Sequence, residues 1–226
     1  MVTILNFPPI DQADENGLLA IGGDLEVKSL LKAYQSGIFP WPISIDFPLA
    51  WFAPDPRGVI DLKDFHVSKS FKKFLARTNM KVEFNQNFES VIMNCAMAKR
   101  KDQAGTWITD QIIDSYINLH REGYAYSVET YLYKDGVKRM VGGLYGTCIS
   151  NFISGESMYH IEDNASKLAL YTLIEFLKAK GIEWLDTQMV TPVIKSMGGK
   201  EISRSEFMQR ISQLNMDALI KPDFNT

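Results

Sequence analysis

The sequence contains few residues of the kinds that bind metals or form disulfides. Of its 226 residues, two are cysteine and three are histidine. Cys95 and Cys148 form no CxxC pair, and His66, His120 and His160 are isolated, so that neither an HExxH motif nor another metal-ligand spacing occurs. We therefore expect no metal site. Two cysteines without such a spacing also suggest a reducing compartment.

Long apolar runs and an excess of positive charge are missing as well. No run reaches the roughly 18 apolar residues that span a bilayer, and the start MVTILNFPPIDQADENG lacks the basic and apolar regions of a signal peptide. A formal net charge of −3 argues against a non-specific nucleic-acid binder, so any such contact must come from a local basic patch. We expect a cytoplasmic, monomeric protein that does not bind membranes.

Proline is scarce after residue 57, and this unevenness divides the chain. Seven of the nine prolines lie earlier, at Pro8, Pro9, Pro40, Pro42, Pro48, Pro54 and Pro56. We therefore expect a loop-rich opening third with short strands and one helix, GDLEVKSLLKAYQSG, capped by Asp24 and ended by Gly37. From about residue 62 the elements become longer and periodic. The expected domains are a small N-terminal one, 1–62, and a larger one, 63–226.

The larger domain combines a run of strands with several helices. Periodicity predicts amphipathic helices over 68–77 and 109–123, the second capped by Thr109. YAYSVETYLY and VKRMVGGLYG indicate a hairpin around KDG, and TCISNFISGESMY continues into a further strand. The clearest helix, 163–181, is capped by Asp163 or Asn164 and is followed by the strand IEWLDTQMV, the short helix TPVIKSMGG and the last helix SEFMQRISQL. This order favours an α+β fold with a mixed, mainly antiparallel sheet, similar to that of GNAT acyltransferases.

The strand-like stretch WLDTQMV carries two polar side chains in otherwise apolar surroundings. Residues i and i+2 of a strand point to the same face, so Asp186 and Gln188 would stand side by side, next to Trp184 and Val190. A buried carboxylate must be paired or hydrogen-bonded. The two residues are therefore either a satisfied structural pair or an active-site pair, and the pattern leaves both possibilities open.

The segment before the long helix is unsuited to coenzyme A. Acyltransferases of this fold hold pyrophosphate on backbone amides at that helix start, with a glycine-rich loop for close approach. Here GESMYHIEDNASK offers Gly155 but also Glu156, Glu162 and Asp163, whose carboxylates would repel a diphosphate. We therefore expect acyl transfer without this cofactor, from a different carrier.

The predicted helix 68–77 has one basic face. Its cations are Lys69, Lys72, Lys73 and Arg77, and its apolar residues Phe71, Phe74 and Leu75 fall on the opposite face. A solvated surface helix is the ordinary interpretation. In a net acidic protein, however, a face without Asp or Glu also suits a phosphate backbone.

Eight short segments occur in order between about residue 16 and residue 210: NGLLAIGGDL, AYQSGIFPWP, WFAPDPRGVI, GTWIT, GGLYG, SGESMY, NASK and LDTQ. Each is weak alone, but the ordered set closely resembles the leucyl/phenylalanyl-tRNA–protein transferase family. The resemblance implies transfer of leucine or phenylalanine, with methionine as a further candidate, from aminoacyl-tRNA to the N-terminal Arg or Lys of a protein. The product would be marked for N-end rule degradation. It also implies a small N-terminal domain before a GNAT-like domain.

The resemblance further assigns roles by position in these motifs. It implies that Asp186 and Gln188 form a catalytic relay, and that Glu156 binds the cationic acceptor end, although a surface or helix-dipole carboxylate is the ordinary interpretation of Glu156. Tyr34 and Trp41 would contact the 3′-terminal adenosine, since aromatic faces stack on unpaired bases, or else simply pack the small domain. The basic helix would grip the acceptor stem of the tRNA.

An apolar pocket for the leucyl or phenylalanyl side chain is expected from Trp107, Leu144, Ile153 and Met158, each of which is also compatible with ordinary core. Leu144 stands where the family motif has methionine, a volume-conserving change. Thr191 stands where some members have asparagine, so it keeps a hydroxyl but lacks an amide.

Two alternatives stay open. A peptidoglycan-type aminoacyl transferase also uses aminoacyl-tRNA, but such enzymes usually have two GNAT-like units and this chain has room for one. A catalytically silent tRNA-binding module would not need the Asp186–Gln188 pair together with Glu156.

Overall fold

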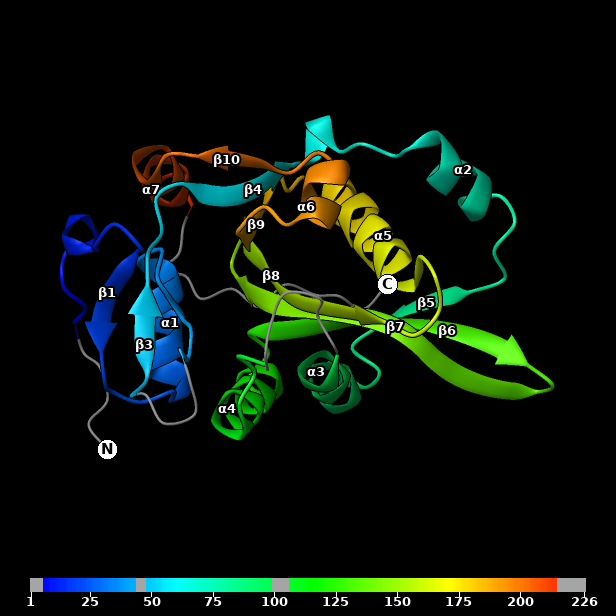
Figure 1. Ribbon diagram of the computed structural model, residues 1–226, viewed down its shortest axis with the longest axis horizontal. Coiled ribbons are helices and arrows are strands. Elements are labelled where there is room, and N and C mark those ends of the chain that lie inside the picture. The colour runs from blue at the N-terminus through cyan, green and yellow to red at the C-terminus, as the bar shows by residue number, and fades with distance from the viewer. Residues whose placement is uncertain (1–5, 44–47, 99–105, 215–226) are drawn as a thin grey trace.

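A seven-stranded sheet runs through the molecule, with helices on both faces (Figure 1). The computed structural model describes residues 6–43, 48–98 and 106–214. The strand order is β10-β4-β9-β8-β7-β6-β5. The strands are β4 (Arg57–Asp61), β5 (Lys81–Phe84), β6 (Ala125–Lys134), β7 (Val137–Ile149), β8 (Phe152–His160), β9 (Trp184–Gln188) and β10 (Lys200–Ile202).

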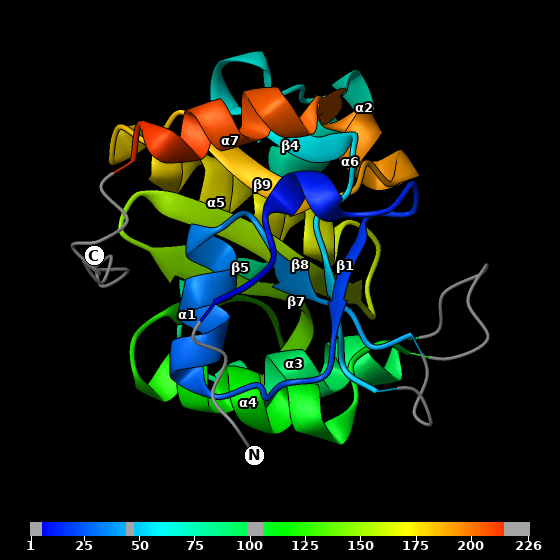
Figure 2. The ribbon, with the colours of Figure 1, turned by 90° about the vertical axis from the view of Figure 1, so that its left-hand side faces the viewer.

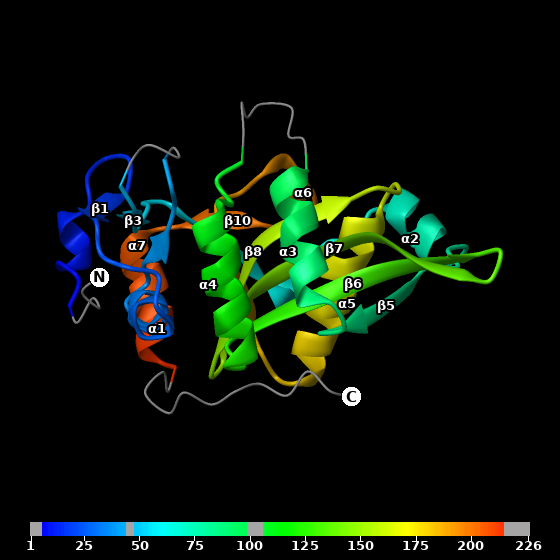
Figure 3. The same cartoon turned by 90° about the horizontal axis from the view of Figure 1, so that it is seen from below.

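The helices form two layers around this sheet. Two of them, α3 (Phe88–Met97) and α4 (Asp110–Arg121), lie side by side on one face, as the view from below shows (Figure 3). The long helix α5 (Ala165–Ala179) crosses the other face, accompanied by the short α6 (Pro192–Ser196). The basic helix α2 (Lys69–Leu75) lies at the far end of that layer.

A smaller unit at the N-terminus packs beside the sheet. It contains a three-stranded sheet of order β1-β3-β2 and one helix, with α7 alongside it (Figure 2). Its elements and α7 are the 3-10 turn Ile10–Gln12, β1 (Leu18–Ile21), α1 (Val27–Gln35), β2 (Phe39–Pro40), β3 (Ala50–Phe52) and α7 (Arg204–Ser212). Its buried Tyr34 and Trp51 belong to the same apolar cluster as Tyr116 of α4 and Phe152 of β8. The unit is thus held against the large sheet by a shared core.

The parallel strands β8 and β9 diverge, and this divergence positions the site. They are joined by the crossover helix α5 and pair at one position, Ser154 opposite Asp186. All other strand pairs in the described residues are antiparallel. The mixed, mainly antiparallel sheet with a β-α-β crossover is therefore confirmed.

A β-bulge in β8 sets the direction of Glu156. Tyr145 of β7 pairs with Ser157, and the next residue, Gly146, pairs with Gly155, so Glu156 is the extra residue of the bulge. A Cβ on Gly146 would lie 1.8 Å from the carbonyl oxygen of Ser154, so only glycine fits opposite the bulge.

Most predicted elements are confirmed, with differences at their ends. The hairpin turn has Asp135 and Gly136 at φ of 52° and 76°, as a tight turn of that type requires. Thr109 caps α4 as predicted, accepting a hydrogen bond from the amide of Ile112. Asn164 occupies the predicted cap position of α5, but its side chain makes no capping hydrogen bond.

The predicted cap of the first helix is wrong. The helix begins at Val27 after Glu26, and Asp24 instead accepts from the Glu26 amide and the Ser29 hydroxyl. Helix α3 and the strands β4, β5 and β10 were not predicted from the sequence. Because β4 lies inside the large sheet, the chain passes from one sheet to the other before residue 57. The domain boundary near residue 62 stays a prediction.

No helix among the described residues is long and apolar enough to cross a membrane.

Candidate active site

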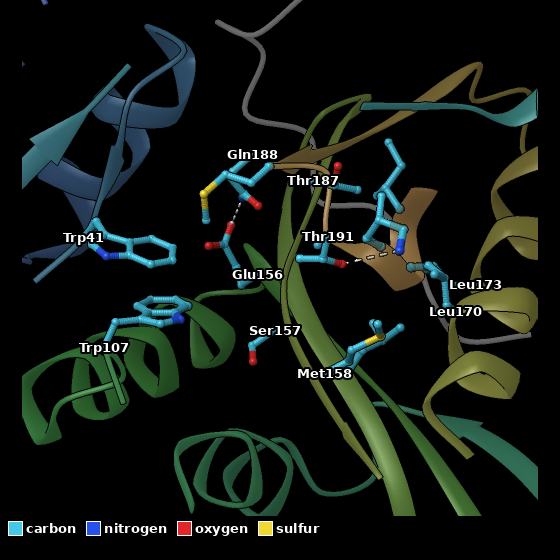
Figure 4. Close-up of a pocket in the computed structure, with 15 residues that line it drawn as sticks. Trp41, Trp107, Glu156, Ser157, Met158, Leu170, Leu173, Thr187, Gln188 and Thr191 are labelled. Atoms are coloured by element: carbon cyan, nitrogen blue, oxygen red, sulfur yellow. Dashed lines mark hydrogen bonds between the residues drawn. The ribbon is translucent and has the colours of Figure 1, made fainter. Parts of the chain in front are cut away.

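A cavity of about 270 Å³ opens where β8 and β9 diverge (Figure 4). Its walls come from the β8 bulge, the end of β9, helices α5 and α6, and two tryptophans from separate loops. The lining residues are Trp41, Trp107, Leu144, Gly155, Glu156, Ser157, Met158, Leu170, Leu173, Leu185, Thr187, Gln188, Met189, Thr191 and Ile194. An apolar space with a few convergent polar groups is the usual form of a small-molecule site.

Glu156 and Gln188 are joined by a hydrogen bond on the wall of this cavity (Figure 4). The Gln188 Nε2 donates to Glu156 Oε1 over 3.0 Å, and the same oxygen accepts from the Ser154 hydroxyl at 2.6 Å. Burial raises the pKa of Glu156 to about 7. Hydrogen bonds from Ser154 and Tyr34 lower this pKa, but their effect is smaller than that of burial. The nearby Asp186 carboxylate adds to the rise. Glu156 therefore changes charge near neutral pH.

Gln188 stands in an unusual backbone conformation at the end of β9. Its φ is 54°, in the left-handed region, and the amide of Met189 bonds the carbonyl of Thr187 across it. Such three-residue turns around a non-glycine residue are rare and strained. The turn brings the Gln188 side chain to the cavity wall, where Thr187 also lies.

Asp186 lies behind Gln188 and does not line the cavity. Its Oδ1 accepts a hydrogen bond from the Gln188 backbone amide at 3.0 Å and another from Arg57 Nε at 2.9 Å. Its Oδ2 accepts a hydrogen bond from Arg57 Nη2 at 2.7 Å. Both side chains of this ion pair are almost fully buried. The predicted side-by-side placement on one face is therefore corrected: Asp186 touches the backbone of Gln188, while the Gln188 side chain turns away toward the cavity.

Two tryptophans face each other at one side of the cavity. The rings of Trp41 and Trp107 stack with centroids 4.8 Å apart and planes inclined by 15°. Tyr34, predicted beside Trp41, is fully buried, and its hydroxyl bonds that of Tyr116. The pKa of Tyr34 is raised well above its usual value by burial and then by the charge of Glu156. Because the ring of Tyr34 is fully buried, no face of it is open to a base. Its hydroxyl instead forms a hydrogen bond with Glu156.

Three of the four predicted pocket residues line the cavity: Trp107, Leu144 and Met158. Ile153 does not. It lies before the bulge and packs in the core cluster that contains Cys148 and Leu173. The bulge separates Ile153 from the part of β8 that lines the cavity. The period-two pattern of the sequence does not reveal a bulge, so it could not exclude Ile153 from the pocket.

The predicted basic helix is present with the expected faces. Ser68 caps α2, Phe71 is buried, and Phe74 stacks on Phe71. All four cations, Lys69, Lys72, Lys73 and Arg77, are exposed, and none forms an ion pair within the described residues. Arg77 lies just beyond the helix end.

Several lining residues, such as Thr187, were absent from the sequence predictions, and its buried hydroxyl has no hydrogen-bond partner. Thr191, which the sequence analysis singled out without assigning it to the cavity, lines it and caps α6 through the amide of Ile194. Leu170 and Leu173 come from the buried stripe of the helix predicted at 163–181, so the stripe itself was a usable signal.

No group of three His, Cys, Asp or Glu residues in the described part of the chain could hold a metal ion. Just before α5, Glu162 and Asp163 are exposed, so their carboxylates lie near the helix start as the sequence indicated. Glu156, by contrast, faces the cavity and not the helix start. The arrangement can hold an apolar side chain beside a hydrogen-bonded carboxyl–amide pair, which suits positioning and proton handling in acyl transfer.

Family models match two parts of the chain. Residues 59–212 match "Leucyl/phenylalanyl-tRNA protein transferase", and residues 23–55 match the N-terminal domain of the same family. A leucyl/phenylalanyl-tRNA–protein transferase of Pseudoalteromonas atlantica is 47% identical over 211 residues, which cover 92% of this chain and 88% of that protein. One of Flavobacterium johnsoniae is 46% identical over 204 residues, covering 90% and 94%.

Among solved structures, "L-PGS from Bacillus licheniformis" is similar with a TM-score of 0.41 and 14% identity, covering 62% of this chain and 48% of that one. At this score the similarity supports no argument about function. The family models and the relatives do: the chain belongs to the leucyl/phenylalanyl-tRNA–protein transferase family and is an aminoacyltransferase.

Proposed function

We propose that the cavity holds the leucyl or phenylalanyl side chain of an aminoacyl-tRNA while a protein N-terminus attacks the ester beside Gln188. The observation that carries this proposal is that one apolar cavity has the Glu156–Gln188 pair on its wall. Leu144, Leu170, Leu173 and Leu185 give the cavity an aliphatic wall that excludes charged side chains strongly. It separates leucine from methionine or phenylalanine only weakly.

The 3′-terminal adenosine stacks on the Trp41–Trp107 pair. These rings line the cavity from the side of the N-terminal unit, and aromatic faces are the usual platform for an unpaired base. The exposed cations of α2 contact the phosphates of the acceptor stem, which supply affinity without sequence reading.

The reaction is aminolysis of an ester. The neutral α-amine of the acceptor attacks the carbonyl carbon, the bond to the ribose oxygen breaks, and the proton lost by nitrogen ends on the ribose hydroxyl. An α-amine has a pKa of about 7.7–8.0, so a usable fraction is neutral at pH 7. The Gln188 Nε2 donates a hydrogen bond to Glu156. This bond orients the side-chain oxygen of Gln188 so that it accepts a hydrogen bond from the attacking amine.

Glu156 binds the cationic side chain of an acceptor that begins with Arg or Lys. Its carboxylate is half-buried and lies beside Gln188, so an amine held by Gln188 has its own side chain within reach of this charge. The product is a protein with an added N-terminal Leu or Phe, which marks it for N-end rule degradation in the cytoplasm.

Transfer is tested with radiolabelled leucyl-tRNA and a peptide that starts with Arg. We expect label in the peptide, and none in the matched N-acetylated peptide, which has no free α-amine. Binding of the tRNA without any labelled peptide would contradict the proposal and favour a tRNA-binding module.

A further inference from the structure

The guanidinium of Arg57 is held on every side in the interior. The side chain is 1% exposed and comes from β4, the strand beside β9. Nε and Nη2 bond both oxygens of Asp186, and Nη1 bonds the carbonyl of Gly37 at 3.1 Å. The rings of Phe39 and Phe207 cover its two faces at 4.7 and 4.4 Å. Such complete enclosure fixes the position of the guanidinium.

Arg57 is one hydrogen-bonded step from the backbone of Gln188. Asp186 Oδ1 accepts from Arg57 Nε at 2.9 Å and from the Gln188 amide at 3.0 Å. The carboxylate is thus anchored by the guanidinium and in turn anchors the turn in which Gln188 has a φ of 54°. A non-glycine residue keeps this conformation only where its surroundings enforce it.

The neighbour of Arg57 brings β4 against the same turn. A Cβ on Gly58 would lie 2.6 Å from the carbonyl carbon of Met189, so only glycine allows this approach. The two consecutive residues Arg57 and Gly58 therefore hold the turn from both sides of the strand.

The opposite end of the guanidinium contacts the N-terminal unit. Gly37 and Phe39 lie shortly before Trp41, which stacks on Trp107 in the cavity. One side chain thus connects the turn bearing Gln188 with the segment bearing Trp41. A buried ion pair is weak evidence for stability, because apolar residues of similar volume often stabilise equally well. The ion pair is more informative about geometry, because it fixes the position of Asp186 and, through it, the backbone of Gln188.

We propose that Arg57 is a positioning residue for aminoacyl transfer: through Asp186 it holds the Gln188 turn in place, and through Gly37 and Phe39 it sets that turn relative to Trp41. The inference rests on the proposed function of the cavity. Arg57 touches no substrate and acts through other residues.

The first test is Arg57→Lys, which keeps the charge but cannot make the two parallel hydrogen bonds to Asp186. We expect kcat at saturating leucyl-tRNA to fall about tenfold to a hundredfold, as a small misplacement of a reacting group can cause. The KM for leucyl-tRNA should change much less. The matched control is Arg210→Lys, which alters the ion pair with Asp61 away from the cavity. It should leave kcat within about twofold of wild type.

A second measurement reads the turn without using activity. Amide hydrogen exchange at Gln188 and Met189 should be faster in Arg57→Lys and unchanged in Arg210→Lys. If Arg57→Lys does not fold, Phe207→Leu opens one face of the guanidinium and keeps the ion pair, and it should show the same changes to a smaller extent.

Wild-type exchange at these amides in a folded Arg57 variant would overturn the inference. Faster exchange with a wild-type kcat would overturn it too, and so would an equal loss of kcat in the Arg57 and Arg210 variants. If the wild-type protein transferred no leucine, the proposed function would fail, while the exchange data would still decide whether Arg57 holds the turn.

Discussion

Replacing Asp186 by asparagine should lower the stability of the protein and also the rate of aminoacyl transfer. Arg57 is 1% exposed and Asp186 is 0% exposed, so the change leaves a buried guanidinium without its counter-charge. Removing one partner of a buried ion pair lowers the free energy of unfolding by roughly 3–5 kcal/mol. The amide oxygen of asparagine keeps part of the hydrogen bonding, so we expect a loss at the lower end, about 3 kcal/mol. For a chain of 226 residues, this corresponds to a fall in Tm of about 6–12 °C.

The same change should lower kcat by about a hundredfold. Asp186 Oδ1 accepts from both Arg57 Nε and the Gln188 amide. An asparagine also presents an NH₂ group, which the guanidinium repels, so its one oxygen cannot serve both donors in the original geometry. The strained turn then relaxes and Gln188 moves, and a displacement of about 1 Å can lower a rate by about this factor.

Two measurements on one preparation separate these effects: the free energy of unfolding in urea, and single-turnover transfer from saturating leucyl-tRNA. Asp61→Asn is the control, because Asp61 pairs with Lys200 and Arg210 and lies outside the cavity. It should lose some stability and no kcat. Unfolding free energy within about 1 kcal/mol of wild type for Asp186→Asn would refute the buried-charge argument. A kcat equal to that of Asp61→Asn would refute the positioning argument.

Three further predictions concern the other parts of the site. Lys69→Glu with Lys73→Glu should weaken tRNA binding and lower the log–log salt slope by roughly 0.7–0.9 per lost phosphate contact, while activity on an aminoacyl-adenosine donor survives; equal loss on both donors would contradict a stem contact. Glu156→Gln should raise the KM for Arg-starting peptides about tenfold to a hundredfold, because a charge-assisted hydrogen bond contributes roughly 1.5–3 kcal/mol. Since burial raises the pKa of Glu156 to about 7, its charge appears as pH rises through 7. The wild-type acceptor KM should therefore fall from pH 6 to 8, and a variant with the same pH profile would contradict this role. Met158→Ala should enlarge the cavity and raise the ratio of phenylalanine to leucine transfer about tenfold, measured by competition of the two aminoacyl-tRNAs.

The helices and the central hairpin were predictable because their signals are local. Thr109 caps α4 at the predicted residue, and the KDG turn has the positive φ angles that its composition favours. The missed helix α3 also carries a local signal. Its buried residues Phe88, Val91, Ile92 and Cys95 follow helical spacing after the cap Asn87, so a closer count of periodicity would have found it.

Partners that are distant in sequence were not predictable in the same way. Arg57 and Asp186 are 129 residues apart, and their pairing depends on β4 lying next to β9. The edge strand β10 has three residues, and β4 has five that are all buried, so neither shows the alternation by which strands are recognised. Motif resemblance indicated that the segment WFAPDPRGVI matters, but not that its arginine pairs with Asp186.

The predicted placement of Asp186 and Gln188 on one face of the strand was wrong, and the reason lies in the backbone at Gln188. Period-two alternation holds only while φ stays negative, and it predicts that both side chains share one face. At Gln188 the φ of 54° breaks the alternation, so Trp184 and Asp186 keep the face toward Arg57 and Gln188 joins Thr187 at the cavity. A left-handed glutamine is unfavourable by itself, and it persists because Asp186, Arg57 and Gly58 hold it. The buried carboxylate therefore has a structural role, since it satisfies the guanidinium, and it also holds the backbone of Gln188, whose side-chain amide we propose meets the substrate.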